Sequence, residues 1–422
     1  MALDGDRPRQ SRRTALALQA GRWAGALSRA SGVGAGVTIG GRVALALAPG
    51  ALAELARGRV ACVVSGTNGK TTTTRLIAAA LAATGLAVVS NTTGANLASG
   101  LVSALSGGSS ADPLARAVLE IDEAVLPRVA AALDPSLIVL TNLSRDQLDR
   151  YGEVGTVAGR WRTMLAARPG QRVVANLRDP FVVWAAQPAQ PVWVDTAMTW
   201  REDATVCPAC GALLEWRDGW FGSACGFEQP APDAVLRDGV LTVGGERVEL
   251  SLALPGRWNQ ANAAMALVAA RELGVDPTQG AAAIAGVGEV AGRQATWRLP
   301  DGRQARLLLA KNPAGWTEVL SYLAGTGSGV VIALNCRIAD GRDPSWLWDV
   351  PFELLSGRMV AASGERALDL AVRLRYAGVE FTLDADPLAA AGQVGGDRVD
   401  IVATYTAFVG LLRRLGHRQA VV

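Results

Sequence analysis

A glycine loop between a predicted strand and a predicted helix constrains this chain more than any other feature. Residues 66–72 read Gly-Thr-Asn-Gly-Lys-Thr-Thr. The apolar, β-branched run 59–64 ahead of them predicts a buried parallel strand, and residues 73–83 behind them predict a helix. In such a loop backbone N–H groups converge on a phosphate, and glycine lets the backbone approach it closely. The sequence therefore predicts a nucleotide site, and the alternative is an ordinary glycine-rich turn.

The same loop predicts which groups contact the nucleotide. Lys70 would reach the terminal phosphates, and the hydroxyl of Thr71 or Thr72 would hold Mg²⁺. The remaining loop residues would cradle the phosphates through their backbone: Gly66, Thr67, Asn68 and Gly69. The first glycine of the usual eight-residue pattern falls on Val64, so the match is to a shorter form of the motif.

Length and composition exclude several classes of function. The 422 residues, half of them hydrophobic, have room for two or three domains. A net charge of +3 predicts no nucleic-acid partner. The single histidine, His417, excludes a histidine-based triad within the chain. No apolar run is long enough to predict a transmembrane segment, and five cysteines do not form a disulfide pattern, which predicts a cytoplasmic protein.

Three segments are predicted from the order of strand and helix patterns. Residues 1–57 predict helices around a glycine-rich stretch, with too little material for a core of their own. Residues 58–295 predict a central α/β domain with a parallel sheet, because strands and helices alternate from residue 59 to about residue 176. Residues 296–422 predict a second, smaller, Rossmann-like α/β domain. Ligands bind at the carboxyl ends of such strands.

An acidic residue stands at one of those strand ends. Glu120 closes the predicted strand 116–121, where it can ligate Mg²⁺ directly or through water. The alternative, which fits Asp122, Glu123 and Asp146 as well, is a helix cap or a first-turn acid.

The predicted central domain carries an insertion at about residues 200–232. Cys207 and Cys210 resemble the first knuckle of a zinc ribbon, but the second knuckle has only Cys225, with glycine where its partner belongs. Three thiolates with water or a carboxylate such as Glu215 or Asp218 can hold zinc. The alternative is a metal-free ribbon held together by aromatic residues.

Two further polar clusters stand out. Asn259 and Asn262 lie on one face of a predicted helix, and their amides suit an adenine edge, although Asn259 can also be an N-cap. Residues 335–353 combine several acids, among them Asp343 and Asp349, with two tryptophans, and a loop of that composition predicts a functional surface.

These stretches together resemble the Mur ligase superfamily: the glycine loop, Glu120, and residues 141–149, 176–180 and 254–262. The short segment ahead of the loop, the ribbon, and residues 311–315 and 340–353 more narrowly resemble the MurT family, the ligase subunits of lipid II isoglutaminyl synthase. The broken ribbon, Cys336, and Gln147 in place of a metal-binding histidine depart from these patterns.

The resemblance implies an ATP- and Mg²⁺-dependent ligase of cell-wall synthesis. It would amidate the α-carboxyl of D-glutamate in lipid II through an acyl phosphate, at the inner membrane surface. Ammonia would come from a GatD-like glutaminase, which would form a heterodimer with this chain. Asp349, or else Asp343, would complete the Cys-His pair of that glutaminase. Lys70 and Glu120 would serve the phosphoryl transfer. The resemblance also implies further nucleotide contacts: Asn176, Asn259 and Asn262 at the adenine, and Arg293 and Lys311 near the phosphates or ribose.

Two other functions fit the same residues. One is a ligase that adds an amino acid, of the folylpolyglutamate synthase type, and the other is a non-catalytic scaffold that binds nucleotide and regulates a glutaminase.

Overall fold

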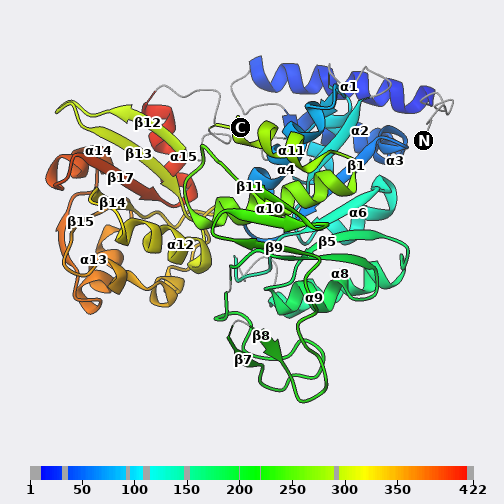
Figure 1. Cartoon of the computed structure of the whole chain (residues 1–422). Coiled ribbons are helices and arrows are strands. Elements are labelled where there is room, and N and C mark those ends of the chain that lie inside the picture. The colour runs from blue at the N-terminus through cyan, green and yellow to red at the C-terminus, as the bar shows by residue number, and fades with distance from the viewer. Residues whose placement is uncertain are drawn as a thin grey trace.

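The computed structural model describes residues 11–30, 37–91, 96–107, 115–146, 153–198, 200–218, 220–288 and 294–415. Two α/β units lie side by side, with the N-terminal helices on the outside of the first and a small two-stranded hairpin projecting from it (Figure 1). The helices are α1 Arg12–Ala30, α2 Val37–Leu47, α3 Ala51–Ala56, α4 Lys70–Ala82, α5 Ala98–Leu105, α6 Leu126–Leu133, α8 Val154–Ala166, α9 Pro180–Ala186, α10 Arg257–Glu272, α11 Pro277–Ala285, α12 Pro313–Ala324, α13 Ala367–Tyr376, α14 Pro387–Ala390 and α15 Tyr405–Arg414. Short 3₁₀ helices are η2 Ser345–Asp349, η3 Phe352–Leu355 and η4 Ala391–Gln393.

The first unit is built on a nine-stranded sheet in the order β11-β10-β9-β6-β5-β4-β1-β3-β2. Its strands are β1 Val60–Ser65, β2 Val88–Val89, β3 Arg116–Glu120, β4 Leu137–Leu140, β5 Arg172–Asn176, β6 Gln190–Asp195, β9 Ala234–Arg237, β10 Val240–Val243 and β11 Glu246–Glu249. Strands β1 to β6 pair in parallel, so the predicted parallel α/β core is confirmed. The small hairpin is formed by β7 Glu215–Arg217 and β8 Trp220–Gly222.

Three strands at one edge were not predicted. Strands β9, β10 and β11 form an antiparallel meander, so the sheet is mixed. Its two-residue turns are Asp238-Gly239 and Gly244-Gly245, and all four residues have positive φ. Aspartate-glycine and glycine-glycine turns of this kind are strong signals for tight hairpins, so these hairpins could have been predicted from the sequence.

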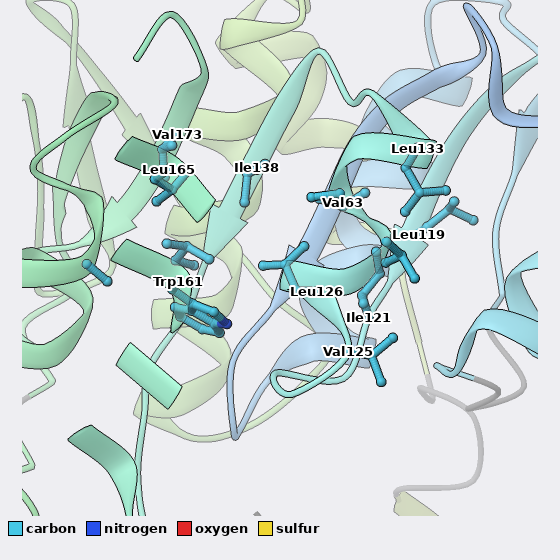
Figure 2. Close-up of a cluster of buried hydrophobic side chains, with 14 of the residues drawn as sticks. Val63, Leu119, Ile121, Val125, Leu126, Leu133, Ile138, Trp161, Leu165 and Val173 are labelled. Carbon is cyan, nitrogen blue, oxygen red and sulfur yellow. The ribbon is translucent and has the colours of Figure 1, made fainter. Parts of the chain in front are cut away.

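Both faces of this sheet are covered by helices. Val63 and Leu119 belong to one buried cluster with Leu126 of α6 and Trp161 of α8, so the layer that contains these helices covers this face (Figure 2). The opposite side chains, such as Val64, pack under α4, α10 and α11. Burial on both faces explains why β1 is apolar at nearly every position rather than alternating. The glycine loop is therefore anchored at one end in a rigid core.

The second unit has a six-stranded sheet in the order β12-β13-β17-β14-β15-β16, with only β12 antiparallel. These strands are β12 Gln294–Arg298, β13 Gln304–Leu309, β14 Gly329–Ala333, β15 Met359–Ser363, β16 Glu380–Leu383 and β17 Arg398–Ala403. Helices again cover both faces, and each face has its own core. The segment between β13 and α12 faces the glycine loop of the first unit, so a site between the units takes side chains from both.

Candidate active site

A cavity of about 440 Å³ lies between the two α/β units. It is lined by the glycine loop, by the carboxyl ends of β3, β4 and β5, by the start of α10 and by residues around the start of α12. Most of the residues predicted to form the site line it: Thr67, Asn68, Gly69, Lys70, Thr72, Glu120, Asn176, Asn259, Asn262 and Lys311. Arg293 and Gln147 lie outside the described residues.

The glycine loop has the shape of a phosphate cradle. Gly66 has φ +143° and Gly69 has φ +83°, a conformation that L side chains rarely adopt. A Cβ on Gly66 would lie 2.1 Å from Thr141 Oγ1, and one on Gly69 would lie 2.1 Å from Asn262 Oδ1. Gly69 caps α4 without a side-chain hydrogen bond, so the positive end of the helix is left to an anionic group. The residues present therefore fit a nucleotide phosphate.

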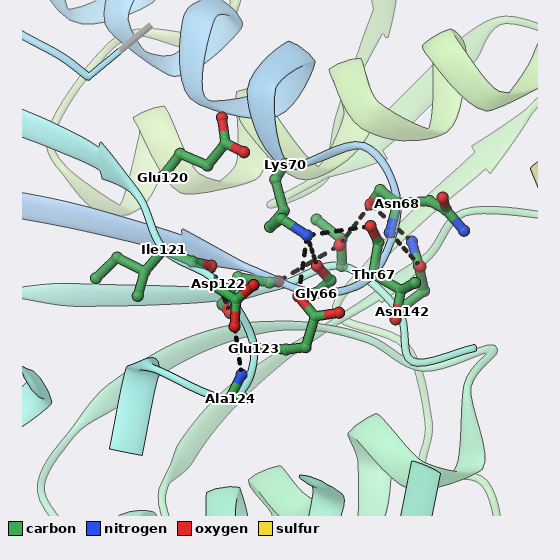
Figure 3. Close-up of polar contacts among 12 residues, drawn as sticks. Gly66, Thr67, Asn68, Lys70, Glu120, Ile121, Asp122, Glu123, Ala124 and Asn142 are labelled. Carbon is green, nitrogen blue, oxygen red and sulfur yellow. Dashed lines mark hydrogen bonds and ion pairs between the residues drawn. The ribbon is translucent and has the colours of Figure 1, made fainter. Parts of the chain in front are cut away.

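Lys70 lies at the centre of the loop (Figure 3). Its Nζ donates to the carbonyl oxygens of Gly66 at 2.5 Å and Thr67 at 3.1 Å, and forms an ion pair of 3.0 Å with Glu123 Oε2. Burial alone would lower the pKa of Lys70, but the carboxylates of Glu123 and Glu120 outweigh it, and the pKa is raised. Lys70 is therefore a stable cation whose charge is balanced by Glu123, a residue that the sequence left among the helix-start acids.

Glu120 and Thr71 lie together at the predicted metal position. Thr71 Oγ1 donates to Glu120 Oε2 at 2.6 Å, and Glu120 is 3 % exposed. Asn91 fixes the main chain of Glu120, because its Oδ1 accepts from the N–H and its Nδ2 donates to the carbonyl oxygen, each at 2.7 Å. A hydroxyl and a carboxylate held this way are oxygen ligands of the kind that Mg²⁺ prefers.

Asp146 is a second acid of the site, which the sequence placed among the possible helix caps and first-turn acids. It lines the cavity, as does Lys311, whose Nζ lies 5.2 Å from the ring centroid of Tyr405. Burial raises the pKa of Asp146 to about 6, even though Lys311 and Lys70 act to lower it. The cavity thus contains a carboxyl group whose protonated form is favoured by burial.

Asn68 connects the loop to both units. Its backbone N–H donates to Asn142 Oδ1 at 2.9 Å, and its carbonyl oxygen accepts from Thr141 Oγ1 at 2.9 Å. Its side-chain amide is paired with the amide of Asn312, with N–O distances of 3.1 and 3.3 Å. Since Asn312 caps α12, the second unit touches the glycine loop directly.

The three predicted adenine contacts have different surroundings. Asn259 Nδ2 donates to the carbonyl oxygen of Pro255 at 2.7 Å, and the N-cap of α10 is Gly256, so the N-cap interpretation of Asn259 is wrong. Asn262 lies against Gly69, closer to the phosphate loop than an adenine contact requires. Asn176 Oδ1 accepts from Thr196 Oγ1 at 3.1 Å at the end of β5.

Asp343 and Asp349 lie apart from the residues that line the described cavity. Asp343 caps its own turn, because its carboxylate accepts from the N–H and the hydroxyl of Ser345 at 2.9 and 2.8 Å. Asp349 ends η2 with a side chain that is 41 % exposed, and its Oδ2 lies 3.2 Å from Arg145 Nη1. Arg145 also pairs with Asp203 in the ribbon segment, so one guanidinium bridges both units beside Asp349.

The three cysteines that the sequence grouped as possible zinc ligands lie close together in the structure. The sulfur atoms of Cys207, Cys210 and Cys225 lie within 4.8 Å of one another. Ser223 Oγ lies 3.5 Å from Cys210 Sγ and 3.8 Å from Cys225 Sγ, beside the place of the missing fourth cysteine. The hydrogen bond with Ser223 contributes most to lowering the pKa of Cys210 to about 7. Glu215 instead pairs with Arg217.

Comparison with known proteins agrees with this architecture. Residues 64–270 match the Mur ligase middle domain, and residues 309–408 match the MurT ligase C-terminal domain. A pseudomurein peptide ligase type C from Methanothermus fervidus has the same fold, with a TM-score of 0.67 at 19 % identity over 87 % of this chain and 80 % of that one. The fold is therefore that of a Mur ligase, a class that in general uses ATP and Mg²⁺.

Two sequence relatives narrow the class. The MurT subunit of lipid II isoglutaminyl synthase from Streptococcus pneumoniae strain R6 is 32 % identical over 97 % of this chain and 98 % of its own length. The corresponding subunit from Staphylococcus aureus strain COL is 34 % identical over 76 % of this chain and 78 % of its own. The chain belongs to the MurT family, as its motifs predicted.

Proposed function

We propose that this chain is the ligase subunit of a lipid II isoglutaminyl synthase. It would convert the α-carboxyl of D-glutamate in the lipid II stem peptide to an amide at the expense of ATP. The observation that carries this proposal is the match to MurT subunits over nearly the whole chain, together with an intact Lys70, Thr71 and Glu120. The presence of Lys70, Thr71 and Glu120 together favours turnover of ATP over a non-catalytic scaffold.

Nucleotide would bind across the glycine loop, the neighbouring strand ends and the facing edge of the second unit. The glycine loop would hold the phosphates, Lys70 would leave Glu123 for the terminal phosphate, and Thr71 and Glu120 would hold the metal. Mg²⁺, when bound, neutralises charge on the phosphates. Asn176 and Asn259 would contact adenine, and Lys311 would face the phosphates from the second unit.

The reaction would proceed in two displacements. A carboxylate oxygen attacks the γ-phosphorus of ATP and ADP leaves, which gives an acyl phosphate. Ammonia then attacks the carbonyl carbon, the C–O bond to phosphate breaks, and the amide forms as the nitrogen loses a proton. Asp146 lines the same cavity, and its raised pKa suits a group that accepts that proton. Contact between Asn68 and Asn312 would help to close the cavity against water, which would otherwise hydrolyse the acyl phosphate.

Ammonia would be supplied by a GatD-like glutaminase subunit. Asp349 is our first choice, and Asp343 our second, for the acid that completes the partner's Cys-His pair. The surroundings of Asp349 support a docking role. Trp348 is 55 % exposed and contacts Tyr376, and α13 presents Leu368 and Val372 to solvent as well. Exposed apolar side chains grouped this way are typical of an interaction surface.

We also propose that the three cysteines bind zinc, with Ser223 or water as the fourth ligand. The purified protein should contain about one zinc per chain by elemental analysis. Cys225→Ser should lose it, whereas Cys336→Ser, outside the cluster, should keep it. A zinc-free wild-type chain that does not take up added Zn²⁺ would show that the ribbon is held by its aromatic contacts, such as Trp216 with Phe221.

The proposed ligase activity can be tested by measuring ADP formation. ADP should form only when ATP, Mg²⁺, ammonium and lipid II with a free α-carboxyl are all present. Lipid II that is already amidated is the matched control, because it offers no carboxylate to phosphorylate. ADP formation driven by amino acids instead of ammonium would favour a ligase of the amino-acid-adding type.

A further inference from the structure

Helix α1 exposes a row of large apolar side chains. Leu16, Trp23 and Leu27 are 69, 72 and 72 % exposed. Their spacing of seven and four residues places them on one stripe of the helix. The helix packs against the protein through other residues, among them Ala17, Leu18 and Gly21, so the stripe is not needed for folding.

The charged side chains around this stripe are mainly basic, with one acidic exception at its start: the Glu54 carboxylate accepts hydrogen bonds from the N–H and the hydroxyl of Ser11 at 2.9 and 3.0 Å. Residues 11–53 contain arginines at positions 12, 13, 22, 29 and 42 and no aspartate or glutamate. Residues 1–10 add two aspartates and two arginines, which cancel. Arg12, Arg13 and Arg22 are exposed. Arg13 Nε donates to the carbonyl oxygen of Leu47 at 2.8 Å, and Arg22 Nη2 donates to that of Ser106 at 3.3 Å, so two of the charges are tethered to neighbouring helices.

The helix is firmly joined to the cavity. A Cβ on Gly21 would lie 2.4 Å from the carbonyl oxygen of Gly40, so α1 and α2 are in close backbone contact. A Cβ on Gly41 would lie 1.8 Å from the carbonyl oxygen of Ser99, which places α2 equally close to α5. Helix α5 begins next to Leu97, which lines the cavity. A surface bound by α1 is thus held at a fixed place relative to the site.

We propose that this face of α1, with Leu16, Trp23, Leu27 and the exposed arginines, docks onto an anionic lipid bilayer. Leucine and tryptophan side chains enter the headgroup region, while arginines pair with lipid phosphates. A second copy of the chain is a poorer occupant, because two such faces would oppose their positive charges. Lipid binding by α1 would bring the cavity to a lipid-linked substrate, and only this part of the inference rests on the proposed function.

The proposal is tested by sedimenting the full chain with vesicles, without nucleotide or lipid II. Vesicles of phosphatidylcholine mixed with phosphatidylglycerol should bind the wild-type chain, and vesicles of phosphatidylcholine alone should bind it at least about tenfold more weakly. Trp23→Ser with Leu27→Ser should lower the partition coefficient about tenfold or more. Arg12→Gln with Arg13→Gln should lower it about fivefold per charge, and raised salt should do the same.

Leu213→Ser is the matched control, because Leu213 is 75 % exposed in the ribbon segment, away from α1. It should bind vesicles like the wild type. No binding to the anionic vesicles, or equal binding by wild type and the Trp23/Leu27 variant, would overturn the proposal. So would a wild-type dimer that this variant dissociates, since the face would then be a contact between copies. Loss of amidation in detergent with vesicle binding intact would count against the proposed function alone.

Discussion

Lys70→Ala is expected to lower ATP turnover by about 10³-fold. The ammonium group is the cation of the glycine loop, and removing one preorganised donor to a transferring group costs about this much. The variant also leaves Glu123 buried without its ion-pair partner, which can cost about 3 to 5 kcal/mol of stability. ADP formation with lipid II and ammonium measures the first effect, and thermal unfolding measures the second.

The double variant Lys70→Ala with Glu123→Gln separates the two effects. Neutralising Glu123 removes the unpaired buried charge, so stability should return toward that of the wild type. Turnover should stay low, because the cation is still missing. Turnover by Lys70→Ala within about tenfold of the wild type would contradict the role of Lys70, whatever the stability of the variant.

Asp349→Asn is expected to lower glutamine-dependent amidation by about 10⁴-fold in the complex with the glutaminase. An amide holds the histidine of a Cys-His pair in the wrong tautomer and cannot stabilise its cation. Amidation with ammonium should be unchanged, because Asp349 lies outside the cavity that we propose holds the reacting carboxyl group. Steady-state rates with each nitrogen source, together with gel filtration of the complex, measure this.

Asp343→Asn is the matched control for Asp349→Asn. Asp343 is an acid of the same loop, but both its oxygens accept hydrogen bonds from Ser345 within its own turn. We expect it to keep activity with both nitrogen sources. A selective loss with Asp343→Asn would move the role to that residue, and full activity of both variants with glutamine would rule out an acid supplied by this loop.

The parts of the fold that the sequence predicted are those with a strong local pattern. The strand before Gly66 and the helix after it follow from a continuous apolar run and a glycine turn, which need no knowledge of distant residues. The sequence also predicted an acidic residue at the end of β3, but it did not predict which acid pairs with Lys70. The pairing depends on how the turn after β3 orients two side chains. Asp122 accepts a hydrogen bond from the N–H of Ala124, whereas Glu123 faces the glycine loop and pairs with Lys70.

The contacts between the two units could not be predicted from the sequence. The pair Asn68 and Asn312 and the pair Arg145 and Asp349 join residues about two hundred positions apart. Their meeting depends on how one unit docks on the other, which no local pattern encodes. The family resemblance indicated a functional role for Asp349, but the ion pair between Asp349 and Arg145 was found only in the structure.

The most direct test of the account is the mass of lipid II after incubation with this chain, ATP, Mg²⁺ and ammonium, and then with a GatD-like partner and glutamine. Exchange of a carboxyl OH for NH₂ lowers the mass by about one unit, and fragmentation should place the change on the α-carboxyl of D-glutamate. We expect this change with ammonium and the chain alone. An unchanged mass in both incubations while ADP accumulates would contradict this expectation, because ATP would then serve another substrate.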